Sequence, residues 1–318
     1  MGVHLPQPHY QLTRLAIALG PGNPLVQALS RRRCAPFGVT LRFSPSAVDL
    51  VKDVRVIRIS PKNWLYAPSI AQSFDSYFGQ VEPTPEGTFL VVDYSGPRLQ
   101  KYRSSGLEFE INSFPEEDSA IDDYFHWYRP TEGDVVFDLG AYCGVSTYTF
   151  SKSVGESGHV YSFEPDASSY ALLLRNIDRH GLRNVTPMLL AVAATSGEAA
   201  FNQEGTLGSV LSRHSPRATT GTVSKVTTID LPTACERFGL PAFIKMDIEG
   251  SELEVLDASR GFLRQNKIQF ALDTHHWVNG IRTTQQVEQI FGECGYETAS
   301  SDGSGFWTTW ARPVASEA

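Results

Sequence analysis

The chain has 318 residues, of which 41% are hydrophobic and 19% charged. That length and balance are typical of a globular protein with one large α/β domain and an additional lobe. The formal net charge of −8 argues against a broad nucleic-acid-binding surface. The sequence contains no signal peptide, no run long enough to span a membrane and no CxxC pair among its four cysteines. We therefore expect a cytoplasmic protein with no membrane or nucleic-acid partner.

Residues 1–115 have an irregular pattern and form the first predicted domain. The first forty residues are interrupted by Pro, Arg and Gly, and we expect them to be poorly ordered or loosely packed. Strand-like runs follow at Val54–Ile59, Thr88–Val92 and Glu108–Ile111. These runs predict a small N-terminal α+β lobe.

Residues 116–318 form the second predicted domain, in which apolar strands alternate with amphipathic helices. The expected strands are Val135–Leu139, His159–Glu164, Val185–Val192, Phe243–Ile248 and Ile268–Leu272. The expected helices are Asp118–Tyr128, Val145–Ser153, Ala167–Arg179, Ser251–Gln265 and Thr284–Cys294. Short added strands are expected at Ala199–Asn202, Ser209–Ser212 and Val223–Thr228, and a closing hairpin at Glu297–Ser300 and Phe306–Trp310. This alternation predicts a doubly wound, mostly parallel seven-stranded Rossmann-like sheet with a C-terminal β-hairpin.

Ligands of such a sheet bind outside the carboxyl ends of its strands, and most of these ends are acidic here. The first strand leads from Asp138 into a turn with glycines at Gly140 and Gly144, and Tyr142 stands where a dinucleotide fingerprint has its middle glycine. Asp138 would repel a phosphate but would pair with an ammonium or sulfonium group. Glu164 ends the next strand, 24 residues after Gly140, at the spacing of an acid that binds ribose hydroxyls. Together these features favour S-adenosylmethionine, a phosphate-free nucleoside that carries positive charge.

Each feature also has a structural interpretation. The glycine turn alone is often a tight strand–helix junction, and Glu164 alone could cap the following helix. Tyr142 could contact adenine or pack under the helix, whereas the small apolar Ala191 and Val192 would let adenine lie flat. The combination favours a cofactor site whose predicted residues are Asp138, Gly140, Ala141, Tyr142, Gly144, Glu164, Pro165, Ala191, Val192 and Asp247.

Four motifs, read in order, resemble those of one enzyme family. With VVFDLGAYCG, YSFEP, VTTIDL and IKMDIEGSE, the chain resembles the FkbM-type family of S-adenosylmethionine-dependent methyltransferases over about residues 116–300. The resemblance implies a Rossmann-like core and methyl transfer to oxygen, commonly a hydroxyl of a sugar or natural product. The chain departs from the family at the fifth strand end, where a Glu near a His is replaced by Asp273, Thr274, His275 and His276.

Methyl transfer to a hydroxyl needs a group that removes the acceptor's proton. The candidate catalytic residues are Asp247, His275 and His276, with either histidine as the base. Mg²⁺ held by Asp247 and Asp273, together with His275, is an alternative but not the expected arrangement. Glu252 is expected to be structural, because acids in the first turn of a helix complement its dipole.

The sequence thus predicts an O-methyltransferase whose partner is a small-molecule or glycan hydroxyl acceptor. The N-terminal lobe is assigned to the acceptor side or to oligomerisation, and a homodimer is left open. Two other classes are kept as alternatives. An NAD-dependent oxidoreductase is disfavoured by Asp138 and the missing middle glycine. An inactive cofactor-binding regulator is disfavoured by the intact acids.

Overall fold

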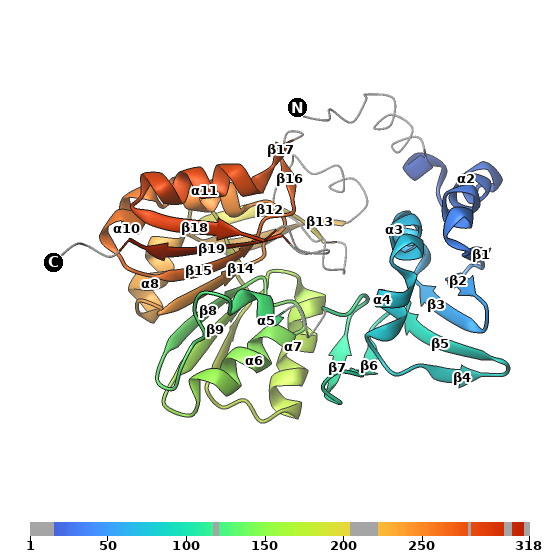
Figure 1. Cartoon of the computed structure of the whole chain (residues 1–318), viewed down its shortest axis with the longest axis horizontal. Coiled ribbons are helices and arrows are strands. Elements are labelled where there is room, and N and C mark those ends of the chain that lie inside the picture. The colour runs from blue at the N-terminus through green and yellow to red at the C-terminus, as the bar shows by residue number, and fades with distance from the viewer. Residues whose placement is uncertain (1–15, 117–120, 204–221, 279–280, 302–306, 315–318) are drawn as a thin grey trace. The chain divides into compact units, whose positions relative to one another are not determined.

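The computed structural model describes residues 16–116, 121–203, 222–278, 281–301 and 307–314 (Figure 1). These residues belong to two compact units, with the boundary between Glu117 and Asp118. Each unit has a hydrophobic core of its own. Within the described ranges, no helix combines the length and the apolar character needed to cross a bilayer.

The N-terminal unit begins with helix α2 (Pro24–Cys34), followed by the short helix η1 (Ala35–Phe37). The Asn23 side chain accepts a hydrogen bond from the Leu25 N–H, and Pro24 occupies the first helical turn. Val26, Ser30 and Cys34 are buried along one side of the helix. The expectation that the first forty residues are poorly ordered or loosely packed is therefore wrong for this helix, whereas residues 1–15 lie outside the described residues.

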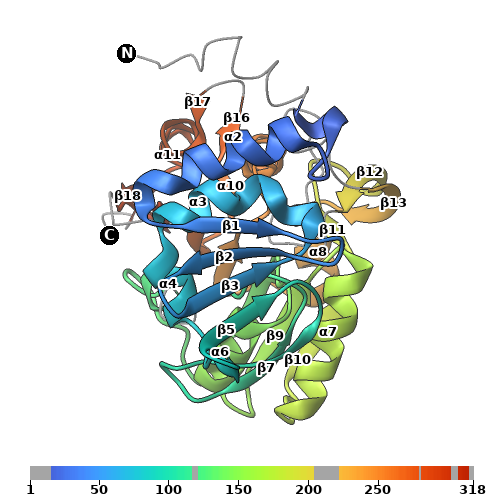
Figure 2. The ribbon, with the colours of Figure 1, turned by 90° about the vertical axis from the view of Figure 1, so that its right-hand side faces the viewer.

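The rest of the unit is a mixed sheet packed against short helices. Its five strands are β1 (Thr40–Phe43), β2 (Val48–Lys52), β3 (Arg55–Ile59), β4 (Thr84–Glu86) and β5 (Phe89–Tyr94), in the order β1-β2-β3-β5-β4. Figure 2 shows β1, β2, β3 and β5 side by side. Only the β3–β5 pair is parallel, and η2 (Pro61–Tyr66), α3 (Ala67–Gln72) and α4 (Phe74–Gly79) lie between these strands in the chain. A separate two-stranded sheet pairs β6 (Arg98–Lys101) with β7 (Glu108–Ile111).

The second unit is built on a seven-stranded sheet. Its order is β10 (Val185–Met188), β9 (His159–Phe163), β8 (Val135–Leu139), β14 (Phe243–Met246), β15 (Gln269–Asp273), β19 (Thr308–Pro313) and β18 (Tyr296–Ser300). The first five strands in this order are mutually parallel, and the hairpin β18–β19 joins the sheet antiparallel to β15. The chain runs outward from β8 to β9 and β10 and then returns to β14 beside β8. The strand order therefore reverses between β8 and β14, which is where such folds bind their ligands.

Helices cover both faces of this sheet (Figure 1). Strand residues such as Phe137, Leu139, Ile244 and Met246 pack in one core with residues of α8 (Leu231–Phe238), α9 (Glu252–Ala258) and α11 (Thr283–Glu293). On the other face, the Phe243 ring lies 6.5 Å from Phe125 and 5.8 Å from Phe150 of α6 (Val145–Val154). Because both faces of the sheet are buried, the sequences of its strands are nearly continuous apolar runs.

Several predicted elements differ from the structure. The expected strand Val185–Val192 is interrupted: β10 ends at Met188, and β11 (Ala191–Val192) pairs instead with β13 (Thr222–Ile229), which also pairs with β12 (Gly197–Gln203). The expected helix Ser251–Gln265 is divided at Ser259 into α9 and α10 (Arg260–Gln265). Helix α8 and the pair β16 (Trp277–Val278) and β17 (Ile281–Arg282) were not predicted.

Of three further predicted elements, two can be compared with the structure. The expected helix Asp118–Tyr128 is too long: α5 spans Ile121–Tyr124, and residues 125–128 are not helical. The expected strand Ser209–Ser212 lies outside the described residues. Helix α7 (Ala167–Arg179) has its predicted bounds.

Candidate active site

The turn after β8 packs directly against the neighbouring strand ends. The N–H groups of Gly140 and Ala141 both donate to the Phe163 carbonyl of β9 at 3.0 Å. Gly140 has φ +80°, and a Cβ there would lie 1.9 Å from the backbone oxygen of Asp247, at the end of β14. Gly144 has φ +93°, and its Cβ would lie 2.6 Å from Leu173 Cδ1 of α7. Both glycines are thus required by φ and by close packing.

Asp138 lies beneath this turn and is completely buried, with 0% exposure. Its Oδ2 accepts hydrogen bonds from Ser146 Oγ at 2.8 Å and Thr147 Oγ1 at 2.7 Å. The cation beside its Oδ1 is Lys245 Nζ at 3.4 Å, and the same ammonium donates to the Gly140 carbonyl at 2.8 Å. In this geometry Asp138 pairs with Lys245 and supports the turn from below, rather than presenting its carboxylate to a ligand.

Glu164 follows β9 and joins the turn to the next helix. It is 6% exposed, its Oε2 accepts from the Tyr142 N–H at 2.8 Å, and its Oε1 accepts from the Asp166 N–H at 2.7 Å. Burial raises its pKa to about 8, against the lowering effect of these N–H groups. Asp166, not Glu164, caps α7, because its carboxylate accepts from the Ser168 N–H. Glu164 is therefore not the helix cap, and Pro165 lies between the two acids.

The predicted adenine-side residues are placed differently from expectation. Ala191 and Val192 are buried in β11, within the three-stranded sheet, and are not the end of a strand of the main sheet. Val192 packs in the main hydrophobic core. Tyr142 has φ +48° and is also buried. These positions favour packing roles for Val192 and Tyr142.

Asp247 lies where β14 ends, beside the reversal of strand order. Its N–H donates to the Leu139 carbonyl at 3.0 Å, which fixes the backbone next to β8. Its side chain is 27% exposed, and no hydrogen bond from the described residues reaches its carboxylate. Burial and the negative charge of Asp273 raise its pKa to about 6. Asp247 is thus an accessible carboxylate at the rim of the sheet.

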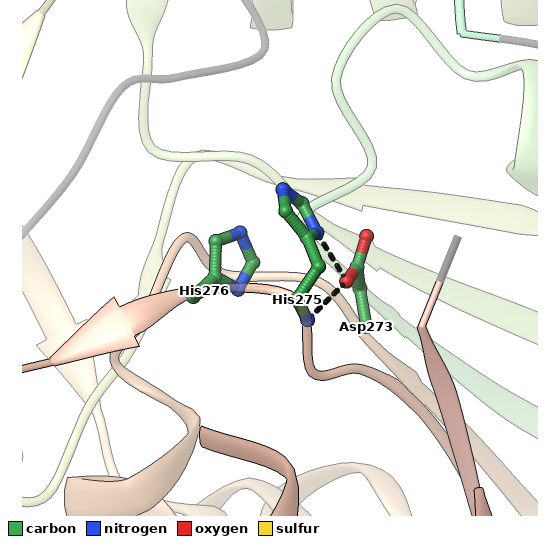
Figure 3. A group of neighbouring side chains, drawn as sticks. All are labelled: Asp273, His275 and His276. Carbon is green, nitrogen blue, oxygen red and sulfur yellow. Dashed lines mark hydrogen bonds and ion pairs between the residues drawn. The ribbon is translucent and has the colours of Figure 1, made fainter. Parts of the chain in front are cut away.

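Asp273, the last residue of β15, and His275, just after it, form a hydrogen-bonded pair (Figure 3). Asp273 Oδ1 lies 2.5 Å from His275 Nδ1 and accepts from the His275 N–H at 3.0 Å. Burial alone would lower the pKa of His275, but the hydrogen bond and charge of Asp273 raise it. The His275 side chain is 42% exposed. The pair therefore holds one ring nitrogen and leaves Nε2 available.

His276 has a different environment, although its ring centroid is 4.3 Å from that of His275. Its side chain is 8% exposed and lies among carboxylates. Nε2 is 3.4 Å from Glu249 Oε2 and 3.9 Å from Asp247 Oδ1, and Nδ1 is 3.5 Å from Glu252 Oε1. Burial lowers the pKa of His276, but Glu252, Glu249 and Asp273 together raise it well above its ordinary value. His276 is thus enclosed, whereas His275 faces outward.

Sequence reasoning missed the two glutamates around His276. Glu252 was assigned to the helix dipole, and its Oε1 does accept from the Ile248 N–H at 2.8 Å at the start of α9. The side chain is nevertheless completely buried and faces His276. The sequence carries no periodic signal for this approach, because only the pairing of β14 with β15 brings together the segments that follow these two strands.

A sheet of five parallel strands with an antiparallel hairpin at one edge, and with acidic residues where the strand order reverses, is typical of the Rossmann-like class of nucleoside-binding enzymes. The model of the methyltransferase FkbM domain matches residues 138–298, just over half of the 318 residues. The chain therefore belongs to the FkbM family of S-adenosylmethionine-dependent methyltransferases, as its motifs indicated. No curated protein matches the chain.

Solved structures give more distant likenesses. The methyltransferase FkbM of Methylobacillus flagellatus KT is 17% identical with a TM-score of 0.44, over 60% of this chain and 47% of that one. This chain thus matches only about half the length of that protein. A SAM-dependent O-methyltransferase of Thermotoga maritima is 14% identical with a TM-score of 0.37, over 70% of this chain and 80% of that one. Because these sequence identities and TM-scores are low, the assignment to the family rests on the match to the family model alone.

Proposed function

We propose that the protein is an O-methyltransferase that transfers a methyl group from S-adenosylmethionine to a hydroxyl of a saccharide or secondary-metabolite acceptor. The observation that carries the proposal is the Asp273–His275 pair, which stands outward at the strand end next to Asp247. A base oriented by a carboxylate is what a neutral hydroxyl acceptor requires.

The acidic groups at the rim fit S-adenosylmethionine. Each Glu164 oxygen accepts one N–H from the described residues and has a further lone pair for a ribose hydroxyl. Asp247 supplies an accessible negative charge for the amino acid or sulfonium portion. When bound, the cofactor would supply a methyl group on a sulfonium, which is a good leaving group. Asp138 would hold the turn without touching the cofactor.

His275 is the proposed general base. Asp273 would keep the Nδ1 proton in place, so that the Nε2 lone pair accepts the proton of the acceptor hydroxyl as oxygen bonds to the methyl carbon. The imidazolium formed in this way would be stabilised by the Asp273 carboxylate until water removes the proton. His276 is enclosed by acids and is not assigned this role.

The first experiment incubates the protein with methyl-labelled S-adenosylmethionine and a panel of saccharides and hydroxylated natural products. Label should appear as a methyl ether. His275→Ala should lower kcat by about 10²–10⁴-fold with little change in cofactor affinity. Asp273→Asn should also lower kcat, because it offers Nδ1 a different hydrogen-bond partner.

His180→Gln is the matched control, since this histidine follows α7 and lies outside the site. It should leave kcat unchanged. Full kcat in both His275→Ala and Asp273→Asn would contradict the assignment of the base, and label on nitrogen or carbon would contradict O-methylation.

A further inference from the structure

His276 is the centre of an unusual arrangement of charge. Three carboxylates, those of Asp247, Glu249 and Glu252, each lie within 4 Å of one of its ring nitrogens. Burying several carboxylates together is costly, and a cation bound among them would reduce that cost.

Neither ring nitrogen of His276 has a hydrogen-bond partner among the described residues, although the residue is more than nine-tenths buried. Buried imidazole nitrogens ordinarily make such bonds. Nε2 instead faces Glu249 and Asp247 across 3.4 and 3.9 Å. Separations of this length match those of two ligand atoms bound to the same ion, which would lie to one side of the line that joins them.

We propose that Asp247, Glu249 and His276 form a binding site for one divalent metal ion. Two ligand atoms on the same ion, each about 2.1 Å from it, lie roughly 3.0–4.2 Å apart. Both Nε2–oxygen separations fall in that interval, and one ligand atom from each residue lies within 4.8 Å of the other two. A small rotation of a carboxylate is enough to bring all three ligand atoms within bonding distance of one ion.

Glu252 supplies the outer partner of such a site. Metal-binding histidines usually direct their other ring N–H to a carboxylate, which fixes the tautomer that presents a lone pair to the metal. Glu252 Oε1 lies 3.5 Å from His276 Nδ1, and the Ile248 N–H holds that oxygen at 2.8 Å. Nε2 is then the metal-binding atom.

A neighbouring set, Asp273, His275 and His276, also has ligand atoms close together. Asp273 Oδ1 is already used by both the N–H and Nδ1 of His275. The set around Glu249 is therefore favoured. One nitrogen and two carboxylate ligands suit Mn²⁺, Co²⁺ or Zn²⁺ better than Mg²⁺, which prefers oxygen and water.

The site would lie beside the proposed base, since the His275 and His276 rings are 4.3 Å apart. A role in polarising the acceptor hydroxyl rests on the proposed function, whereas metal binding itself does not. Its test therefore measures binding directly, without cofactor or acceptor.

The test titrates the full chain, treated with chelator and dialysed, with Mn²⁺ by electron paramagnetic resonance and with Co²⁺ by visible absorption. We expect one ion per chain. Asp247→Asn and Glu249→Gln should each weaken binding by at least about 100-fold, and Glu252→Gln by about 10–100-fold. Asp273→Asn and the exposed Glu254→Gln should bind as the unchanged chain does, and circular dichroism should show that every variant is folded.

No binding of either ion by the folded chain at millimolar concentration would overturn the proposal. Binding that Asp273→Asn abolishes and Glu249→Gln leaves intact would also overturn it, because the ion would then occupy the other set. Neither result would alter the test of methyl transfer, so failure of the metal site and failure of the proposed function are distinguishable.

Discussion

Residues of one type have different tasks in this site because of what surrounds them. His275 and His276 are adjacent in the chain, yet one pairs with a single aspartate at the surface and the other lies among three acids. Asp138 lies next to the last residue of β8 and Glu164 directly follows β9, but Asp138 pairs with Lys245 inside the protein. Glu164 keeps unused lone pairs at the rim. Environment, rather than residue type, separates supporting groups from groups that meet a ligand.

The raised pKa of Glu164 predicts how cofactor affinity depends on pH. In the cofactor-free chain this carboxyl is protonated below a pKa of about 8 and ionised above it. Ribose hydroxyls donate to the ionised form, so binding should favour carboxylate. The affinity for S-adenosylhomocysteine should therefore increase as pH rises to about 8 and then level off, by up to about tenfold per pH unit below 8. Calorimetry between pH 6 and pH 9 measures this.

Glu164→Gln provides the control for that slope. Glutamine keeps the shape and an acceptor oxygen but does not titrate, so the variant should bind more weakly and lose this part of the pH dependence. An equal slope in both proteins would assign the titration to another group and contradict the role of Glu164.

Single residues were only partly predictable from the sequence. Acids at strand ends could be identified because parallel strands bring their carboxyl ends to one edge. The direction of each side chain could not be identified, because it depends on partners far apart in the chain. Ser146 and Thr147 donate hydrogen bonds to the Asp138 carboxylate, and Lys245 forms an ion pair with it from a different strand. Polar residues in the first turn of α6 were the available signal for the first two.

At the scale of elements, the turn between β8 and α6 positions the whole site. Its backbone touches β9 through the Phe163 carbonyl and β14 through Asp247. Lys245 also stabilises the turn, because its ammonium donates a hydrogen bond to the Gly140 carbonyl. A turn held at three points loses little further conformational freedom when a ligand binds, which favours affinity.

Gly140→Ala tests this close packing. The substitution would place a Cβ 1.9 Å from the Asp247 oxygen at φ +80°, so the turn or β14 must move. We expect the free energy of unfolding to fall by about 3 kcal/mol or more, and cofactor affinity to fall with it. Urea unfolding of the full chain, followed by circular dichroism, measures the first effect.

Gly181→Ala separates the contact from the dihedral angle. Gly181 has φ +60°, but a Cβ there would have no atom within 4 Å. The expected cost is about 1–2 kcal/mol, from the left-handed conformation alone. Equal costs at the two glycines would show that the Asp247 contact does not constrain the turn.

Predictions of elements succeeded where the pattern was local. Helix α7 and strand β8 have the predicted bounds, because apolar periodicity and flanking turns mark both ends. The prediction of a single strand over Val185–Val192 failed because this apolar stretch contributes strands to two sheets. The pairing of β11 with β13 depends on a distant segment. The break at Ser259 was also hidden, since the apolar residues of α9 and α10 continue one helical pattern.

At the scale of the whole molecule, the chain consists of a unit that carries the family's motifs and another with its own five-stranded sheet. The α+β character of the N-terminal unit could be predicted from its strand-like runs, but its strand order could not. The pair β3–β5 is parallel across three short helical segments, a connection that periodicity does not reveal. The identity of the proposed acceptor could not be predicted from the sequence either, because no residue type in the rim is specific to one hydroxyl compound.

The central claim is that the acidic rim between β8 and β14 receives S-adenosylmethionine. Isothermal titration of the full chain with S-adenosylhomocysteine and, separately, with NAD⁺ tests it most directly. The proposal predicts one S-adenosylhomocysteine per chain, an affinity at least about tenfold weaker in Glu164→Gln, and no measurable binding of NAD⁺. Tight binding of NAD⁺ with no binding of S-adenosylhomocysteine would contradict it.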